Sequence, residues 1–133
     1  MSAQPASRFL HRALILDAVA SGATALLLIA AAPALAPLLG LPVALMRGAG
    51  LLLLPYVAFV GLVARRGRLE PAAVWTIIIS NALWAAASFL LLLSGQIAPT
   101  ALGIAFVVVQ AVIVALLGEL QYVGLRRPAV EAA

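Results

Sequence analysis

Four long apolar runs constrain what this chain can fold into. They cover residues 13–33, 43–64, 72–93 and 100–122, and a helix needs about 20 mostly apolar residues to cross a bilayer. Of the 133 residues, 66% are hydrophobic and 9% are charged, whereas a soluble domain has roughly 25% charged residues. A soluble fold of this length could not cover so much apolar surface. We therefore predict an all-α membrane protein with four transmembrane helices.

The connections between the runs are short and rich in proline and glycine. They read PALAPLLGLP, RRGRLEP and SGQIAP in chain order. Proline and glycine interrupt helices, and short connections place successive helices side by side and antiparallel. We expect two helical hairpins in one antiparallel bundle, so that residues 1–133 form a single domain with short tails.

The arginines predict the orientation in the membrane. Seven of the eight flank the runs on one side, namely Arg8, Arg12, Arg65, Arg66, Arg68, Arg126 and Arg127. Arginine-rich loops stay on the cytoplasmic side, so both termini are expected there. The lysine-free, alanine- and leucine-rich composition is typical of a bacterium with a GC-rich genome, which indicates the inner membrane. The net charge of +4 is then explained by lipid headgroups, not by nucleic acid.

The first run could also be read as a signal peptide. Arginines precede it, and Ala34-Leu35-Ala36 has the small-residue pattern of a cleavage site. However, the run exceeds the usual 7–15 apolar residues of a signal peptide and contains Asp17. Pro37 would follow the cut. We expect the first helix to be retained.

A polar stripe in the first run is a candidate functional site. Ser21 and Thr24 follow Asp17 at i+4 and i+7, so the three side chains share one helical face. One interpretation is a proton- or cation-binding carboxylate near the cytoplasmic side. The other is a structural carboxylate near the helix N-terminus, paired with an arginine. The sequence leaves both open.

A second polar layer is predicted in the last two runs. Counted from their shared loop, Asn81 and Gln110 differ in height by only about 4 Å, at 1.5 Å per residue, so an amide–amide hydrogen bond could join the helices. Trp84 shares the Asn81 face and needs a partner for its indole N–H. Asn81 and Trp84, together with Pro55 and Tyr56 of the second run, mark where a cavity is expected. The layer either clasps the helices or lines a path for a ligand or ion.

Two further charged residues are expected to make structural contacts. Arg47 lies about one helical turn inside the second run, on the side of the membrane whose loops contain no arginine. No carboxylate lies at that depth, so Arg47 should contact headgroups or main-chain carbonyls. Glu119 points away from Gln110 by helical geometry and should reach the cytoplasmic interface near Arg126 or an arginine of the middle loop.

No motif for catalysis or for a cofactor is visible. The chain has no cysteine and one histidine, His11, and it has no glycine-rich nucleotide loop and no H-E-x-x-H motif. We expect no enzyme activity, no metal and no cofactor. The leading interpretation is an accessory membrane module that self-associates or docks to a larger membrane protein. The alternatives are a small proton- or ion-coupled transporter or channel, and a protein that binds a lipid or apolar molecule between its helices.

Overall fold

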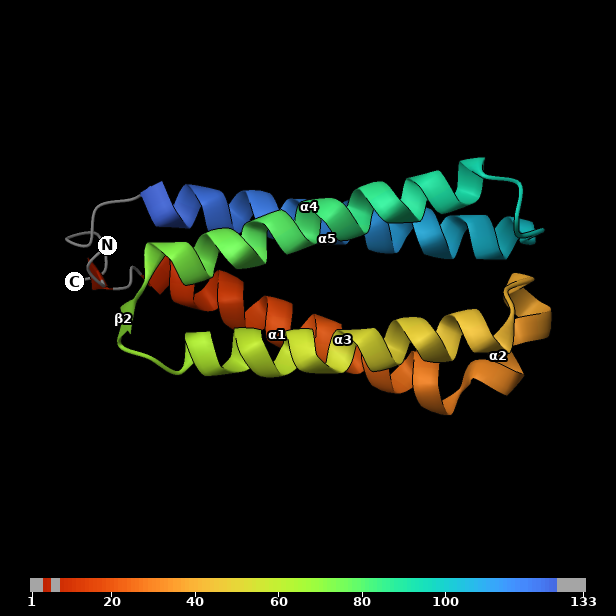
Figure 1. Cartoon of the computed structure of the whole chain (residues 1–133), viewed down its shortest axis with the longest axis horizontal. Helices are drawn as coiled ribbons and strands as arrows, with labels where there is room; N and C mark the ends of the chain where they lie inside the picture. Colours follow the sequence, from red (N-terminus) through yellow and green to blue (C-terminus); the bar gives the residue numbers. More distant parts are fainter. Residues whose placement is uncertain (1–3, 6–7, 127–133) are drawn as a thin grey trace.

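Four long helices make up the bundle in the computed structural model, which describes residues 4–5 and 8–126 (Figure 1). They are α1 (Arg8–Ala30), α3 (Val43–Ala64), α4 (Pro71–Leu93) and α5 (Ala101–Arg126). Each is long and apolar enough to cross a membrane. The prediction of a helical membrane protein with four spans is therefore confirmed, whereas Arg127 lies outside the described residues.

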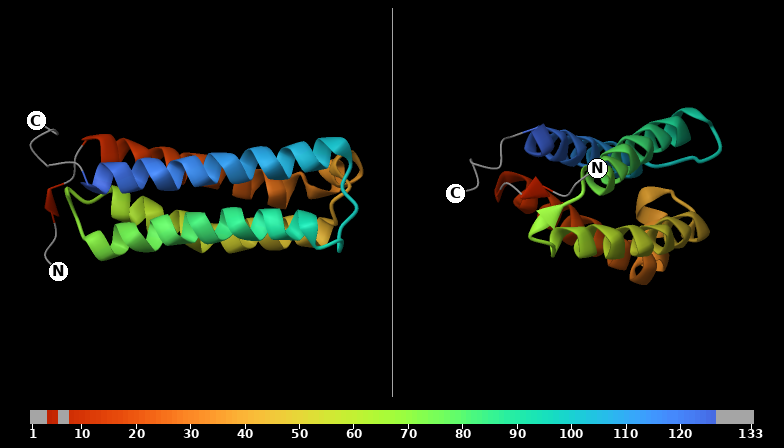
Figure 2. Two further views of the ribbon diagram at one scale, coloured as in Figure 1. Left: turned by 90° about the horizontal axis from the view of Figure 1, so that it is seen from above. Right: turned by 60° about the vertical axis from the view of Figure 1, so that its left-hand side comes forward.

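The helices pack as two hairpins. Helix α1 packs along α3, and α4 packs along α5. The hairpins meet mainly where α1 contacts α5, whereas α3 and α4 barely touch, and Figure 2 shows the four helix axes running along one common direction. The beginning of α1, the α3–α4 connection and the end of α5 lie at one end of the bundle, and α2 and the α4–α5 loop lie at the other (Figure 1).

The first connection is more ordered than the sequence predicted, because a short helix, α2 (Ala32–Leu39), forms within it. Helix α1 consequently ends at Ala30, three residues before the predicted end. Pro33 lies in the first turn of α2 and has no N–H to donate to the carbonyl of Ile29. The Arg47 Nε donates to that carbonyl instead, at 3.2 Å. Arg47 thus satisfies a main-chain acceptor that the proline leaves open.

The start of α5 is fixed against the end of α2. The Thr100 hydroxyl donates to the Leu38 carbonyl at 2.7 Å, and the Thr100 N–H donates to the Leu39 carbonyl at 3.0 Å. The same hydroxyl accepts from the Gly103 N–H, which makes Thr100 the N-cap of α5. A side chain on Gly103 would overlap the Leu39 carbonyl, so only glycine permits this approach.

At its other end, α1 begins five residues earlier than predicted. Leu10 and Leu14 are buried there in a cluster with apolar residues of α3 and α4, and Leu10 also packs closely on α5. A Cβ atom on Gly124 would lie 2.9 Å from the Leu10 Cα, so glycine allows this contact. Beside it, the two-residue strands β1 (Gln4–Pro5) and β2 (Arg68–Leu69) pair antiparallel. The longer α1 places Asp17 about 13 Å along the helix axis from Arg8, and so deeper in the bundle than a position near the helix N-terminus.

Candidate functional site

A buried carboxylate joins all four long helices. Asp17 of α1 is 0% exposed. Its Oδ1 accepts from the Ser21 hydroxyl at 2.9 Å. Its Oδ2 accepts from the Tyr56 hydroxyl of α3 at 2.7 Å, from Asn81 Nδ2 of α4 at 3.1 Å and from Gln121 Nε2 of α5 at 2.7 Å. Asn81 Nδ2 also donates to Gln121 Oε1 at 2.9 Å.

The partners of Asp17 differ from the arginine that the structural interpretation expected. All four donors are neutral, and within residues 8–126 no arginine forms an ion pair with this carboxylate. The reason is depth, because Asp17 lies about 13 Å from Arg8 along α1. Three of the donors converge on Oδ2 and one contacts Oδ1, so amide and hydroxyl groups hold Asp17 in place of a counter-ion.

The Tyr56 hydroxyl lies between two acceptors. It is 2.7 Å from Asp17 Oδ2 and 2.9 Å from Asn81 Oδ1. A phenol carries one hydrogen and can satisfy one of them fully at a time. When Tyr56 donates to Asp17, Asn81 Oδ1 keeps unused acceptor capacity.

The predicted hydrogen bond between Asn81 and Gln110 is wrong. A Cβ atom on Gly118 would lie 3.3 Å from the Asn81 Cβ, so position 118 of α5 is level with Asn81. Gln110 is eight residues, about 12 Å, further along the helix. The equal-height prediction assumed that α4 ends and α5 begins at the same level along the bundle. In the structure, α5 begins about 7 Å further toward α2 than the level at which α4 ends, where Thr100 contacts α2. Gln121 lies close to the level of Asn81 and forms the amide–amide hydrogen bond with it instead.

Gln110 and Trp84 form a second polar group closer to α2. The Trp84 Nε1 donates to Gln110 Oε1 at 2.9 Å, and Gln110 Nε2 donates to the Ser88 hydroxyl at 2.9 Å. Gln110 Nε2 also donates to the carbonyl of Val107. The indole N–H therefore has a partner inside the bundle, as its place on the Asn81 face predicted.

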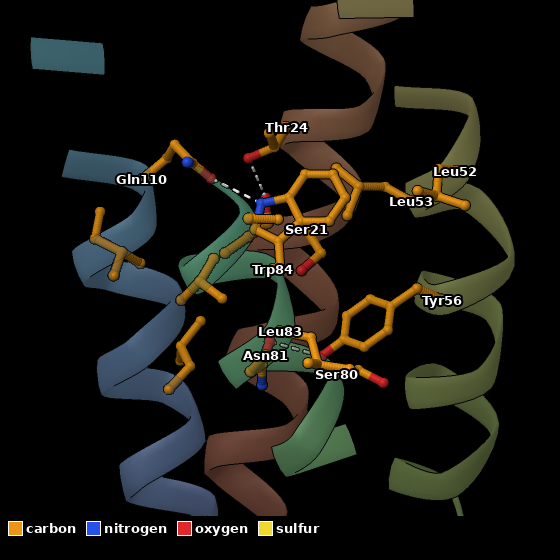
Figure 3. A pocket seen from close by; sticks show the side chains of 15 residues that line it. Ser21, Thr24, Leu52, Leu53, Tyr56, Ser80, Asn81, Leu83, Trp84 and Gln110 are labelled. Atoms are coloured by element: carbon orange, nitrogen blue, oxygen red, sulfur yellow. Dashed lines mark hydrogen bonds between the residues drawn. The ribbon is translucent and has the colours of Figure 1, made fainter. Parts of the chain in front are cut away.

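A cavity of about 480 Å³ lies between the two polar groups (Figure 3). All four long helices line it, with Ala20, Ser21, Thr24, Leu52, Leu53, Tyr56, Ser80, Asn81, Leu83, Trp84, Ala87, Gln110, Ile113, Val114 and Leu117. Of the four residues that the sequence marked for a cavity, Tyr56, Asn81, Trp84 and Pro55, the first three line it. Leu52 and Leu83 are each 65% exposed, so the cavity reaches the lipid-facing surface between α3 and α4.

A smaller cavity of about 90 Å³ lies on the α2 side of the first. Thr24, Trp84 and Gln110 line both cavities. The Trp84–Gln110 hydrogen bond therefore belongs to the wall between them.

Glu119 does not contact the arginine expected for it. It is exposed on the bundle surface, and within the described chain no hydrogen bond or ion pair joins it to an arginine. Arg126 instead donates to the Tyr122 hydroxyl at 2.7 Å. Arg126 lies seven residues, about 10 Å, along α5 from Glu119, which is too far for a direct contact.

Two members of the Asp17 network were not predicted as site residues. The sequence marks Tyr56 only for the cavity, without a link to Asp17, and it gives Gln121 no role. The signal for Gln121 was its distance of eleven residues from Gln110, which places both on one face of α5. For Tyr56, a phenol deep in an apolar helix should find a polar partner.

The chain matches no protein-family model, no curated protein and no solved structure. The functional argument therefore depends on the chemistry of the cavity and of the Asp17 network.

Proposed function

We propose that this membrane protein binds a small, mainly apolar molecule that enters its cavity from the lipid between α3 and α4. This is the third function considered from the sequence, the binding of a lipid or apolar molecule between helices, now assigned to a specific cavity. The proposal involves no catalytic step, metal or cofactor.

The cavity is the observation that carries this proposal. Its volume of about 480 Å³ falls in the 300–1,000 Å³ range of small-molecule sites, which are mostly apolar with a few polar groups. Leucine, isoleucine, valine and alanine side chains form most of the wall, and the polar groups lie at its two ends. An elongated molecule with an apolar body and one polar end fits this arrangement.

The membrane orientation is part of the proposal. Arg8, Arg65, Arg66 and Arg126 belong to the end of the bundle where α1 begins and α5 ends. The positive-inside rule favours the cytoplasm for that end, in the inner membrane of a bacterium. The Asp17 network is then nearer the cytoplasmic side, and α2 faces the opposite side.

A proton- or ion-coupled transporter or channel is the second candidate. Asp17 supports it, because ionisable groups inside membrane bundles commonly mark proton or ion pathways. The two cavities that share the Trp84–Gln110 wall also follow each other along the bundle. The accessory-module interpretation, with self-association or a larger membrane partner, assigns no role to the cavity.

Fluorescence of Trp84 tests the binding proposal. The chain has two tryptophans, so Trp75→Phe leaves Trp84 as the sole reporter in the cavity wall. In phosphatidylcholine proteoliposomes, a terminally brominated dodecanol should quench Trp84 to saturation at about one molecule per chain. The matched variant Trp84→Phe leaves Trp75, which packs against Tyr122 away from the cavity, and reports quenching caused by partition into lipid.

Two neighbouring alanines provide a steric control. Both are exposed at the bundle surface, but Ala87 lines the cavity and Ala86 does not. Ala87→Leu should weaken saturable binding about 10-fold, or about 1.4 kcal/mol, because the larger side chain occupies space that the ligand needs, while Ala86→Leu should leave binding unchanged. Quenching of Trp84 that never saturates, or equal effects of both leucines, would contradict the proposal.

A further inference from the structure

We infer that the cavity selects a molecule whose polar end is a protonated amine, that is, a cation with N–H donors. This inference rests on the proposed binding function and adds the chemical class of the ligand. It follows from two observations. The hydrogen-bond donors of the cavity wall are already used within the protein, and the nearest charged side chain is a carboxylate.

Every side-chain N–H and O–H that lines the cavity is already donated to an acceptor of the protein. The Ser21 and Tyr56 hydroxyls donate to Asp17, and those of Thr24 and Ser80 donate to carbonyls of their own helices. The indole N–H of Trp84 donates to Gln110. The amide N–H groups of the cavity wall are used in the same way, those of Asn81 at Asp17 and Gln121 and those of Gln110 at Ser88 and Val107.

What remains toward the cavity is acceptor capacity. Hydroxyl oxygens keep a lone pair when they donate, and Ser21, Thr24 and Ser80 each present one. Asn81 Oδ1 has the most unused acceptor capacity, because its donor, the Tyr56 hydroxyl, has a single hydrogen and shares it with Asp17. In a low-dielectric interior, an acceptor without a full partner is costly. A ligand that donates hydrogen bonds therefore completes the network, whereas a carboxylate or phosphate does not.

The charge around the cavity favours a cation over a neutral donor. No lysine or arginine is among the lining residues, within the part of the chain that the structure describes. The nearest charge is the Asp17 carboxylate, one side chain behind the wall formed by Ser21, Tyr56 and Asn81. Tyr56 and Trp84 also present aromatic rings, which attract cations. An anionic head would meet a buried negative charge with no compensating group.

Competition among four dodecyl compounds tests this inference. In the Trp75→Phe background, each compound displaces the brominated dodecanol, and the recovery of Trp84 fluorescence gives its affinity. Dodecylamine is protonated at pH 7, as a lysine side chain is. It should bind at least 10-fold more tightly than dodecanol, because hydrogen bonds donated by a charged group are stronger than those between neutral groups. Dodecyltrimethylammonium, which has charge but no N–H, should fall below dodecylamine, and dodecanoate should bind most weakly.

Two variants should change this selectivity in opposite directions. Asp17→Asn removes the charge and should abolish the preference for dodecylamine over dodecanol. Tyr56→Phe removes one of the three donors to Asp17 Oδ2 and the hydroxyl next to Asn81 Oδ1, and it should tighten dodecylamine binding several-fold. Glu119→Gln makes the same chemical change as Asp17→Asn at an exposed site on α5 and is the matched control. If Asp17→Asn does not fold, the gain in Tyr56→Phe still tests the inference, because a purely structural defect would weaken binding.

The outcomes separate the inference from the function on which it rests. If the brominated dodecanol never quenches Trp84 to saturation, the binding function itself fails. If it does, but dodecanoate competes as well as dodecylamine, or dodecyltrimethylammonium equals dodecylamine, the binding function stands and the inferred amine head is overturned. Unchanged selectivity in both Asp17→Asn and Tyr56→Phe would overturn it as well.

Discussion

The Tyr56 hydroxyl donates to Asp17 Oδ2 at 2.7 Å and joins the two helices of the first hairpin. Asn81 and Gln121 donate to the same oxygen from the second hairpin. One carboxylate oxygen thus connects α1 with the other three long helices. Helices α3 and α4 have few contacts along their length, but at this level the Tyr56 hydroxyl of α3 approaches Asn81 Oδ1 of α4 to 2.9 Å.

Asp17→Leu should destabilise the bundle by about 3 kcal/mol, since removing one partner of a buried polar network leaves its donors unpaired. Unfolding by dodecyl sulfate in mixed micelles measures the change. Glu119→Leu, at an exposed carboxylate, should stay within about 0.5 kcal/mol of the parent chain. A similar loss in both variants would show that the Asp17 contacts add nothing specific to stability.

A double-mutant cycle should separate the observed amide pair from the one that helical spacing suggested. Asn81 Nδ2 donates to Gln121 Oε1 at 2.9 Å, so Asn81→Leu and Gln121→Leu should be non-additive by about 0.6–1.7 kcal/mol, between the average and the maximum of the couplings measured between membrane helices. Asn81→Leu and Gln110→Leu share no hydrogen bond and should add within about 0.5 kcal/mol. The reverse pattern would restore the Asn81–Gln110 pair.

The sequence predicts most of this fold because its strongest signals are local. Apolar run length identifies the four spans, and the i, i+4, i+7 spacing correctly places Asp17, Ser21 and Thr24 toward the interior. The pairing of amides could not be predicted in this way. It depends on the relative height of α4 and α5, which the contacts of Thr100 with Leu38 and Leu39 determine. These residues are about 60 positions apart in the chain.

The same height difference makes Gly103 sensitive to substitution. Gly103→Ala should destabilise the bundle by about 1–3 kcal/mol, because its Cβ would overlap the Leu39 carbonyl and push α5 away from α2. Gly48→Ala is the matched control, since a Cβ atom there meets nothing within 4 Å, and alanine should stabilise α3 by up to about 1 kcal/mol. Dodecyl sulfate unfolding should therefore give opposite signs, and a loss in both variants would contradict the assigned contact.

The proposed orientation predicts which loop faces the cytoplasm. The chain has no cysteine, so Gly67→Cys in the arginine-rich loop and Gln96→Cys in the α4–α5 loop each introduce one label site. Both positions are exposed. In intact spheroplasts, a membrane-impermeant maleimide should label Cys at position 96 and reach position 67 only after permeabilisation, because arginines hold their loop on the inner side. Labelling of position 67 before permeabilisation would invert the bundle and place the Asp17 network nearer the outer surface.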